Sequence, residues 1–117
     1  MTLKIDFGKR IKELRESLFM SQEALAEKLG VHRNTLARIE NGDNFVSLET
    51  LEKIRATFDV EYDELFMFNK PVKKDPHKAF MLKFKELNEA DAKFFLSTIN
   101  AYLQAKQSNS KSSKKKK

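Results

Sequence analysis

The sequence predicts an all-α fold, and three observations support this fold class. Apolar residues recur every three or four positions in successive segments, as they do on one face of an α-helix. No segment alternates apolar and polar residues in the way that is typical of a β-strand. Residues that favour helix ends, such as Ser21, Gly30 and Ser47, lie between the periodic segments. The 117 residues are enough for one small domain and an extension.

Three helices are expected in the first 41 residues. The first has an apolar stripe made of Phe7, Ile11, Leu14 and Leu18. Ser21 is suited to cap the start of a second helix, and Gly30 is suited to end it in a left-handed conformation. Only one or two residues separate Gly30 from a third helix over residues 32–40. The second and third helices should therefore cross at a steep angle instead of packing antiparallel.

Two more helices complete a five-helix domain over residues 1–69. Asn41 and Gly42 form a turn signal, and Ser47 can cap a fourth helix. The inward face of the fourth helix is predicted to consist of Leu48, Leu51, Ile54 and Phe58. A short fifth helix over residues 61–68 should close the bundle.

A helical extension and a polar tail follow the predicted domain. A linker and a two-helix extension are expected in residues 70–106, with one helix starting at Pro76 and the next after Asn88. The second of these helices has an amphipathic stripe made of Ala92, Phe95, Leu96, Ile99, Tyr102 and Leu103. Residues 107–117 hold no apolar side chain and are rich in Lys and Ser, so we expect a disordered tail there.

The net charge of +6 comes from the C-terminal part of the chain. Residues 1–69 carry ten Lys and Arg against thirteen Asp and Glu, whereas residues 70–117 carry thirteen Lys against four acidic residues. A nucleic-acid interaction of the first domain must therefore depend on where its cations lie, and not on bulk charge.

The composition excludes several classes of function. The chain has no Cys, and its two His, His32 and His77, lie far apart, so we expect no metal site. It lacks a phosphate-cradling Gly loop and a paired His and acid, so we expect neither enzymatic activity nor a cofactor. No apolar run approaches the roughly 20 residues of a membrane span, and no apolar signal region opens the sequence. We expect a cytoplasmic, nucleoid-associated protein with no membrane partner.

The third predicted helix has a strongly polar outer face. At about 100° per residue, Leu36 and Ile39 share one side of this helix. The opposite arc holds Arg33, Asn34, Ala37 and Arg38. Arg can bind the major-groove edge of guanine, Asn can bind that of adenine, and an Ala methyl group can touch thymine. We therefore predict that these residues, together with His32 at the start of the helix, read bases; the alternative is an ordinary solvated face.

Residues 7–68 resemble the phage-repressor/Cro type of helix-turn-helix domain, also called the xenobiotic-response-element type. The stretches that carry the resemblance are GKRIKELRE, SQEALAEKLGV, NTLARIENG and SLETLEKI followed by DELF. The resemblance implies a five-helix DNA-binding domain that acts as a homodimer on a two-fold symmetric site in double-stranded DNA. It also implies that Arg33, Asn34 and Arg38 lie at base-reading positions.

The resemblance assigns roles to further residues. Gln22 matches the glutamine that opens the second helix and contacts a DNA phosphate. Arg15 and Glu40 match a structural ion pair, in which the arginine can also face the phosphates. Asn41 either contacts a phosphate or ends the third helix. The sequence departs from the family at His32, where Ser or Thr is more common. It also departs in the loop after Gly42, which lacks the basic residues of many members.

These features predict a sequence-specific transcriptional regulator, and we favour a dimeric repressor that inserts residues 32–40 into the major groove. Two alternatives stay open. One is a DNA-binding antitoxin whose C-terminal helices bind a toxin, and the other is a protein- or RNA-binding adaptor that uses the helix-turn-helix as a scaffold. The aromatic segment 76–106 could extend the core, form the dimer interface or bind a protein partner. The Lys-rich end is either a solubilising tail or an electrostatic arm on DNA.

Overall fold

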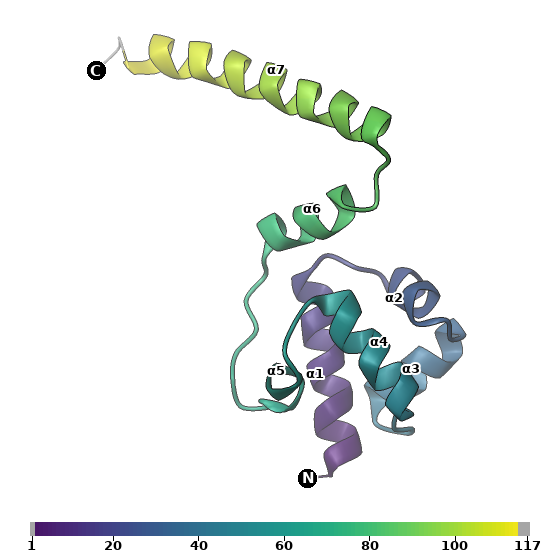
Figure 1. The fold of residues 1–117 in the computed structure, drawn as a ribbon. Helices are drawn as coiled ribbons and strands as arrows, with labels where there is room; N and C mark the ends of the chain where they lie inside the picture. Colours follow the sequence, from purple (N-terminus) through teal and green to yellow (C-terminus); the bar gives the residue numbers. More distant parts are fainter. Residues whose placement is uncertain (1, 115–117) are drawn as a thin grey trace. The chain divides into compact units, whose positions relative to one another are not determined.

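The computed structural model describes residues 2–114, and the described part is built from α-helices, as the sequence predicts. The chain divides into two compact units, Met1–Ala79 and Phe80–Lys117. The helices, shown in Figure 1, are α1 (Leu3–Ser17), α2 (Gln22–Leu29), α3 (Arg33–Asn41), α4 (Leu48–Phe58), α5 (Tyr62–Phe66), α6 (Pro76–Phe84) and α7 (Glu89–Lys114).

The first unit is a bundle in which α1 packs against α3 and α5, and α2 packs against α3 and α4 (Figure 1). The predicted stripe of α1 is buried in this bundle, as are the inward residues of α2 and α3. The largest fully buried side chains are Phe7, Ile11, Leu25, Leu29, Leu36, Ile54, Phe58 and Leu65. The five-helix domain predicted from apolar periodicity is therefore confirmed.

The helix ends are formed by the residues that the sequence analysis selected. Ser21 Oγ accepts a hydrogen bond from the Ala24 N–H at 3.0 Å, and Ser47 Oγ accepts one from the Thr50 N–H at 3.1 Å. Gly30 (φ 69°) and Gly42 (φ 85°) adopt the left-handed conformation that ends α2 and α3. Each cap satisfies backbone groups that a helix end would otherwise leave without a partner.

The start of α4 differs from the prediction. Leu48, predicted to point inward, is 79% exposed. Phe45, in the loop before α4, packs instead against the buried ring of Phe7, with a distance of 4.9 Å between ring centroids. Because Ser47 caps α4, Leu48 lies in the first turn, and the apolar face reaches the core only further along the helix.

Hydrogen bonds hold the segment that follows α5 against the preceding helices of the first unit. The Asp75 N–H donates to the carbonyl oxygen of Ser17 at 2.8 Å, and Lys78 Nζ donates to that of Asp59 at 3.0 Å. Ala79, in the first half of α6, is buried. The first unit therefore includes the predicted linker and extends beyond the expected end at residue 69.

The helix α7 is longer than predicted, since it continues to Lys114. The disordered tail was expected to begin at residue 107. No Pro or Gly occurs between Glu89 and Lys114 to end the helix, and Gln, Lys and Ser side chains are compatible with its continuation. Residues 115–117, which make up the rest of the predicted tail, lie outside the described residues.

Gly8 allows α1 to approach α3 closely. A Cβ atom built on Gly8 would overlap the carbonyl oxygen of Ile39 and would lie 2.8 Å from that of Glu40. These are backbone atoms near the end of α3, so they cannot rotate away as a flexible side chain could. The observed packing of α1 against α3 therefore requires a residue without a side chain at position 8.

We predict that Gly8→Ala destabilises the first unit. Alanine would gain about 1 kcal/mol of helix propensity, but overpacking against a rigid neighbour costs about 1–3 kcal/mol or more. The free energy of unfolding, measured from urea denaturation followed by circular dichroism, should therefore fall. Lys9→Ala, at the exposed neighbouring position, is the control and should change it by less than about 0.5 kcal/mol. Equal stability of Gly8→Ala and wild type would contradict the close contact.

Candidate nucleic-acid interface

The helix α3 has one buried and one exposed face, and both of its ends are fixed. Leu36 and Ile39 are buried to 0% and 2% exposure against the core. His32 precedes the helix as its N-cap, and its Nδ1 accepts a hydrogen bond from the Asn34 N–H at 3.3 Å. Histidine thus supplies the cap at a position where Ser or Thr was expected to be more common. The capped ends hold the outer face of α3 in a defined orientation.

The residues predicted to read bases lie on the outer face of α3. Arg33, Asn34 and Arg38 are exposed, as is His32, and Ala37 is half-buried. Asn41, at the C-terminal end of the same helix, is also exposed. The helix therefore presents these side chains together on its surface, while their contact with DNA stays a prediction.

The turn between α2 and α3 sets the angle at which α3 leaves the core. Gly30 adopts a left-handed conformation, and the next N–H, that of Val31, donates to the carbonyl oxygen of Ala26 at 3.0 Å. Ala26 is only 3% exposed, so a small side chain fits between the packed helices. Its burial agrees with the helix-turn-helix arrangement predicted from the sequence.

A buried polar network joins α1, α2 and α3. Nε and Nη2 of Arg15 donate to the two carboxylate oxygens of Glu40 at 2.8 and 3.1 Å. Nη1 of Arg15 donates to the carbonyl oxygen of Met20 at 2.8 Å. Nε2 of Gln22 donates to Oε1 of Glu40 at 2.9 Å. The network therefore fastens the start of α2 and the end of α3 to the end of α1.

The burial of Arg15 limits it to a structural role in this arrangement. The resemblance allowed the arginine to face DNA phosphates as well as to pair with Glu40. Arg15 is only 7% exposed, and all three of its guanidinium nitrogens donate to groups within the protein. A phosphate contact would require this guanidinium to leave its partners, so we do not include Arg15 in the proposed DNA contacts.

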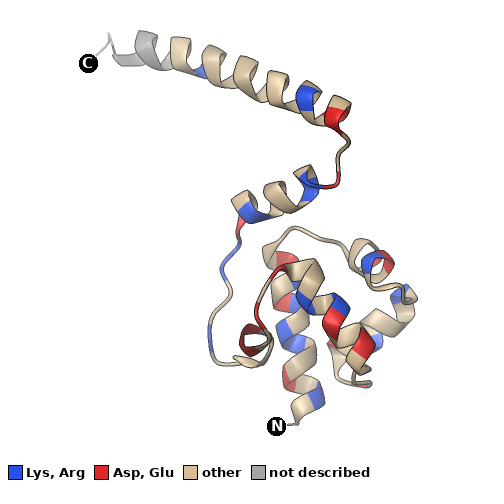
Figure 2. Cartoon of the chain, in the orientation of Figure 1, with Lys and Arg blue, Asp and Glu red and all other residues tan. Residues whose placement is uncertain are grey.

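The exposed charges of α3 are positive although residues 1–69 carry more acidic than basic side chains. Figure 2 shows acidic residues on α1, α4 and α5. The one acidic residue of α3 is Glu40, and it is 5% exposed and paired with Arg15. The outward charges of the helix are those of Arg33 and Arg38. The distribution of charge therefore favours an anionic partner at α3 in particular.

The sequence patterns did not reveal one buried cation of α1, which lies on the side that packs against α5. Arg10 is 2% exposed, and it donates from Nε to the carbonyl oxygen of Glu64 at 2.8 Å and from Nη1 to that of Lys70 at 2.6 Å. These bonds hold α5 and the following segment against α1. The available signal was the position of Arg10 three residues after Phe7, on the apolar side of the helix.

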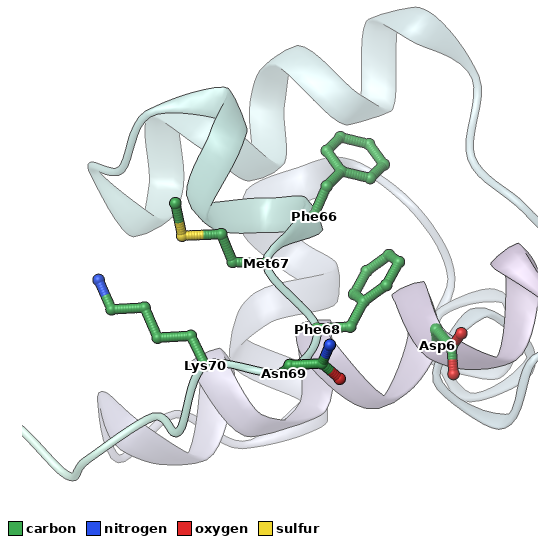
Figure 3. A pocket seen from close by; sticks show the side chains of 6 residues that line it. All are labelled: Asp6, Phe66, Met67, Phe68, Asn69 and Lys70. Carbon is green, nitrogen blue, oxygen red and sulfur yellow. The ribbon is translucent and has the colours of Figure 1, made fainter.

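An open hollow lies where the end of α5 meets α1, with a volume of about 630 Å³. It is lined by Asp6, Phe66, Met67, Phe68, Asn69 and Lys70. Figure 3 shows Phe66 and Phe68 extending to the same side of the backbone, with Met67 directed away from them. None of the residues predicted to contact DNA lines this hollow, so it is separate from the candidate interface.

Within residues 2–114, no group of three or more His, Cys, Asp or Glu side chains is arranged to hold a metal ion. No helix of this part of the chain is both long and apolar enough to cross a membrane.

Comparison with known proteins identifies the family. Residues 11–65 match the helix-turn-helix family. The control protein C.MunI of Mycoplasma sp is 43% identical over 65 residues, which make up 55% of this chain and 88% of that protein. The chain belongs to the helix-turn-helix family. An uncharacterized HTH-type transcriptional regulator of Archaeoglobus fulgidus is 40% identical over 60 residues, or 51% of this chain and 86% of that protein.

A solved structure of a restriction-modification controller protein has a similar fold. The restriction-modification controller protein C.AhdI from Aeromonas hydrophila matches with a TM-score of 0.51 and 39% sequence identity, over 53% of this chain and 94% of that one. Other relatives are longer, and the matched part is 25% of a protein from Pyrococcus abyssi. The family match ends at residue 65, before α6 and α7.

We predict that breaking the buried Arg15–Glu40 pair strongly destabilises the first unit. Arg15→Met keeps most of the side-chain volume but leaves a buried carboxylate without its cation, and such a loss costs about 3–5 kcal/mol. The free energy of unfolding from urea denaturation should fall by this order.

The exposed ion pair between Glu49 and Lys53, with 3.5 Å between Oε1 and Nζ, supplies a matched control. Lys53→Met removes a cation from a solvated pair and should cost less than about 0.5 kcal/mol. If Arg15→Met were no more destabilising than Lys53→Met, the buried network would not hold the three helices together.

Proposed function

We propose that this DNA-binding transcriptional regulator of the helix-turn-helix family reads a specific sequence by inserting α3 into the major groove. The observation that carries the proposal is the exposed face of α3, where Arg33, Asn34 and Arg38 extend from a helix whose opposite side is buried. Arg33 and Arg38 have the donors to bind guanine, and Asn34 has a donor and an acceptor to bind adenine. The methyl group of Ala37 can contact thymine. His32 lies beside them at the helix start.

The start of α2 is the proposed phosphate contact. Gln22 is half-buried, and one N–H of its side-chain amide donates to Glu40. The same amide has a second N–H, which can donate a hydrogen bond to a phosphate oxygen. Because the Glu40 bond fixes the amide, Gln22 would need little further ordering to bind DNA. The backbone N–H groups at the start of α2 favour an anion at the same place, and Asn41 is a second candidate at the end of α3.

The proposed assembly on DNA is a homodimer. Two copies of α3 related by a two-fold axis would enter successive major grooves about 34–36 Å apart. A binding site with two-fold symmetry matches this arrangement, and two half-sites raise both affinity and specificity. We propose repression as the outcome, because a dimer that covers a promoter blocks transcription through DNA binding alone.

We predict that Arg33→Ala weakens binding to the preferred duplex by about 1–3 kcal/mol, and that the loss arises at one base pair of each half-site. Asn34→Ala should do the same at a different base pair. Gln22→Ala should weaken preferred and random duplexes to a similar extent, because a phosphate contact carries no sequence information. The measurement is fluorescence anisotropy with a duplex selected from a random DNA pool.

Removal of residues 107–117 is the matched control for general electrostatic binding. This deletion should lower affinity for preferred and random duplexes alike and should leave the preferred sequence unchanged. If Arg33→Ala and Asn34→Ala bound DNA as the wild type does, while the deletion abolished binding, the basic C-terminal end would be the DNA contact and α3 would not.

A further inference from the structure

The helix α7 carries an apolar stripe that is largely exposed. On this stripe Phe95, Leu96, Tyr102 and Leu103 are 44%, 52%, 63% and 54% exposed. Ile99 and Ala92, on the same face, are half-buried. Large apolar side chains gathered on one face of a helix are typical of an interaction surface.

The spacing of the stripe is symmetric about Ile99. Counted outward from Ile99, apolar residues lie three positions away on both sides (Leu96 and Tyr102), and four positions away on both sides (Phe95 and Leu103). Two identical helices that cross antiparallel with Ile99 on their two-fold axis would therefore place Phe95 opposite Leu103 and Leu96 opposite Tyr102. Every large residue of the stripe would meet an apolar residue. Such self-complementarity is what a two-fold symmetric interface requires.

We propose that α7 pairs antiparallel with α7 of a second copy of this chain, with the two-fold axis passing at Ile99. This inference names the interface of the proposed homodimer and so rests on the proposed function. The paired segment would run from Ala92 to Lys106, which is about 21 Å at 1.5 Å per residue, or about four turns along each helix. The interface would be of the knobs-into-holes kind that antiparallel helices form.

The charges at the ends of the stripe favour the antiparallel orientation. Asp91 lies just before the stripe, beside Ala92, and Lys106 lies at its other end, three positions after Leu103. Both are exposed. In the antiparallel pair, Lys106 of one copy lies opposite Ala92 of the other copy, next to its Asp91. In a parallel pair, Lys106 would face Lys106, and Asp91 would face Asp91. Like charges in register disfavour the parallel pair.

Cysteine cross-linking tests the proposal directly, because the natural chain has no Cys. Ile99→Cys places two thiols at the proposed axis, so mild oxidation of the full chain should convert most of it to a disulfide-linked dimer. Phe95→Cys alone should not cross-link, since the two thiols would lie about 12 Å apart along the pair, beyond the roughly 7 Å limit between Cα atoms. A mixture of Phe95→Cys and Leu103→Cys should cross-link, because these positions face each other.

Phe94→Cys is the matched control. Phe94 is also a large exposed residue of α7, at 64% exposure, but it points about 140° away from the centre of the stripe at 100° per residue. The Phe94→Cys variant should therefore stay monomeric on non-reducing gels. Sedimentation of the wild-type chain without oxidant should give a dimer, and Leu96→Glu should shift it to a monomer.

Each alternative has its own result. Cross-linking of Phe95→Cys alone would establish a parallel pair and overturn the proposed geometry. The wild type could be a dimer while neither Ile99→Cys nor the mixture of Phe95→Cys and Leu103→Cys cross-links; the interface would then lie elsewhere. A monomeric wild type would overturn the self-pairing and leave the stripe to a different partner. None of these measurements uses DNA. Cross-linking as proposed in a protein that binds no duplex would therefore reject the DNA-reading function while the α7 pairing stands.

Discussion

The attachment of α3 to α1 is the constraint on which the candidate interface depends. Gly8 lets the backbone of α1 meet the last turn of α3, and Arg15 holds Glu40 of that same turn with two hydrogen bonds. Glu40 also accepts from Gln22, so the start of α2 is tied to the same point. A buried ion pair contributes little unless its geometry is good and its remaining hydrogen-bonding groups are satisfied. Both conditions hold here, since no buried polar side-chain atom among the described residues lacks a hydrogen-bond partner.

This attachment explains how residues 1–69, which carry more acidic than basic side chains, can present a face suited to DNA. Glu40, the acidic residue of α3, is buried and paired with Arg15. The outward charges of the helix are therefore those of its two exposed arginines. Association with DNA through bulk charge would instead be expected of the Lys-rich C-terminal part. Under the proposed function, specific reading would depend on the placement of a few side chains by a rigid scaffold, and the buried network would supply that placement.

Local rules made most of the first unit predictable. Apolar stripes, Ser caps at residues 21 and 47, and Gly30 and Gly42 at helix ends each depend on neighbours within a few residues. Two features that were missed, the roles of Arg10 and Gly8, depend on distant partners. Arg10 binds carbonyl groups 54 and 60 residues away, and the neighbours of Gly8 come from α3. The positions predicted to read bases were selected from helical geometry. The polar ones are exposed as expected, and Ala37 is half-buried. Which base each would contact depends on a DNA partner that the sequence does not contain.

The central claim is that the outer face of α3, and not the basic C-terminal part, binds DNA specifically. The most direct test is a titration of the ¹⁵N-labelled full chain with a selected duplex, in which NMR spectra record the backbone amide signals. We expect large chemical-shift changes at residues 32–41 and at the first turn of α2, which persist when salt is raised enough to release nonspecific DNA. Changes confined to residues 106–117, with α3 unaffected, would contradict it.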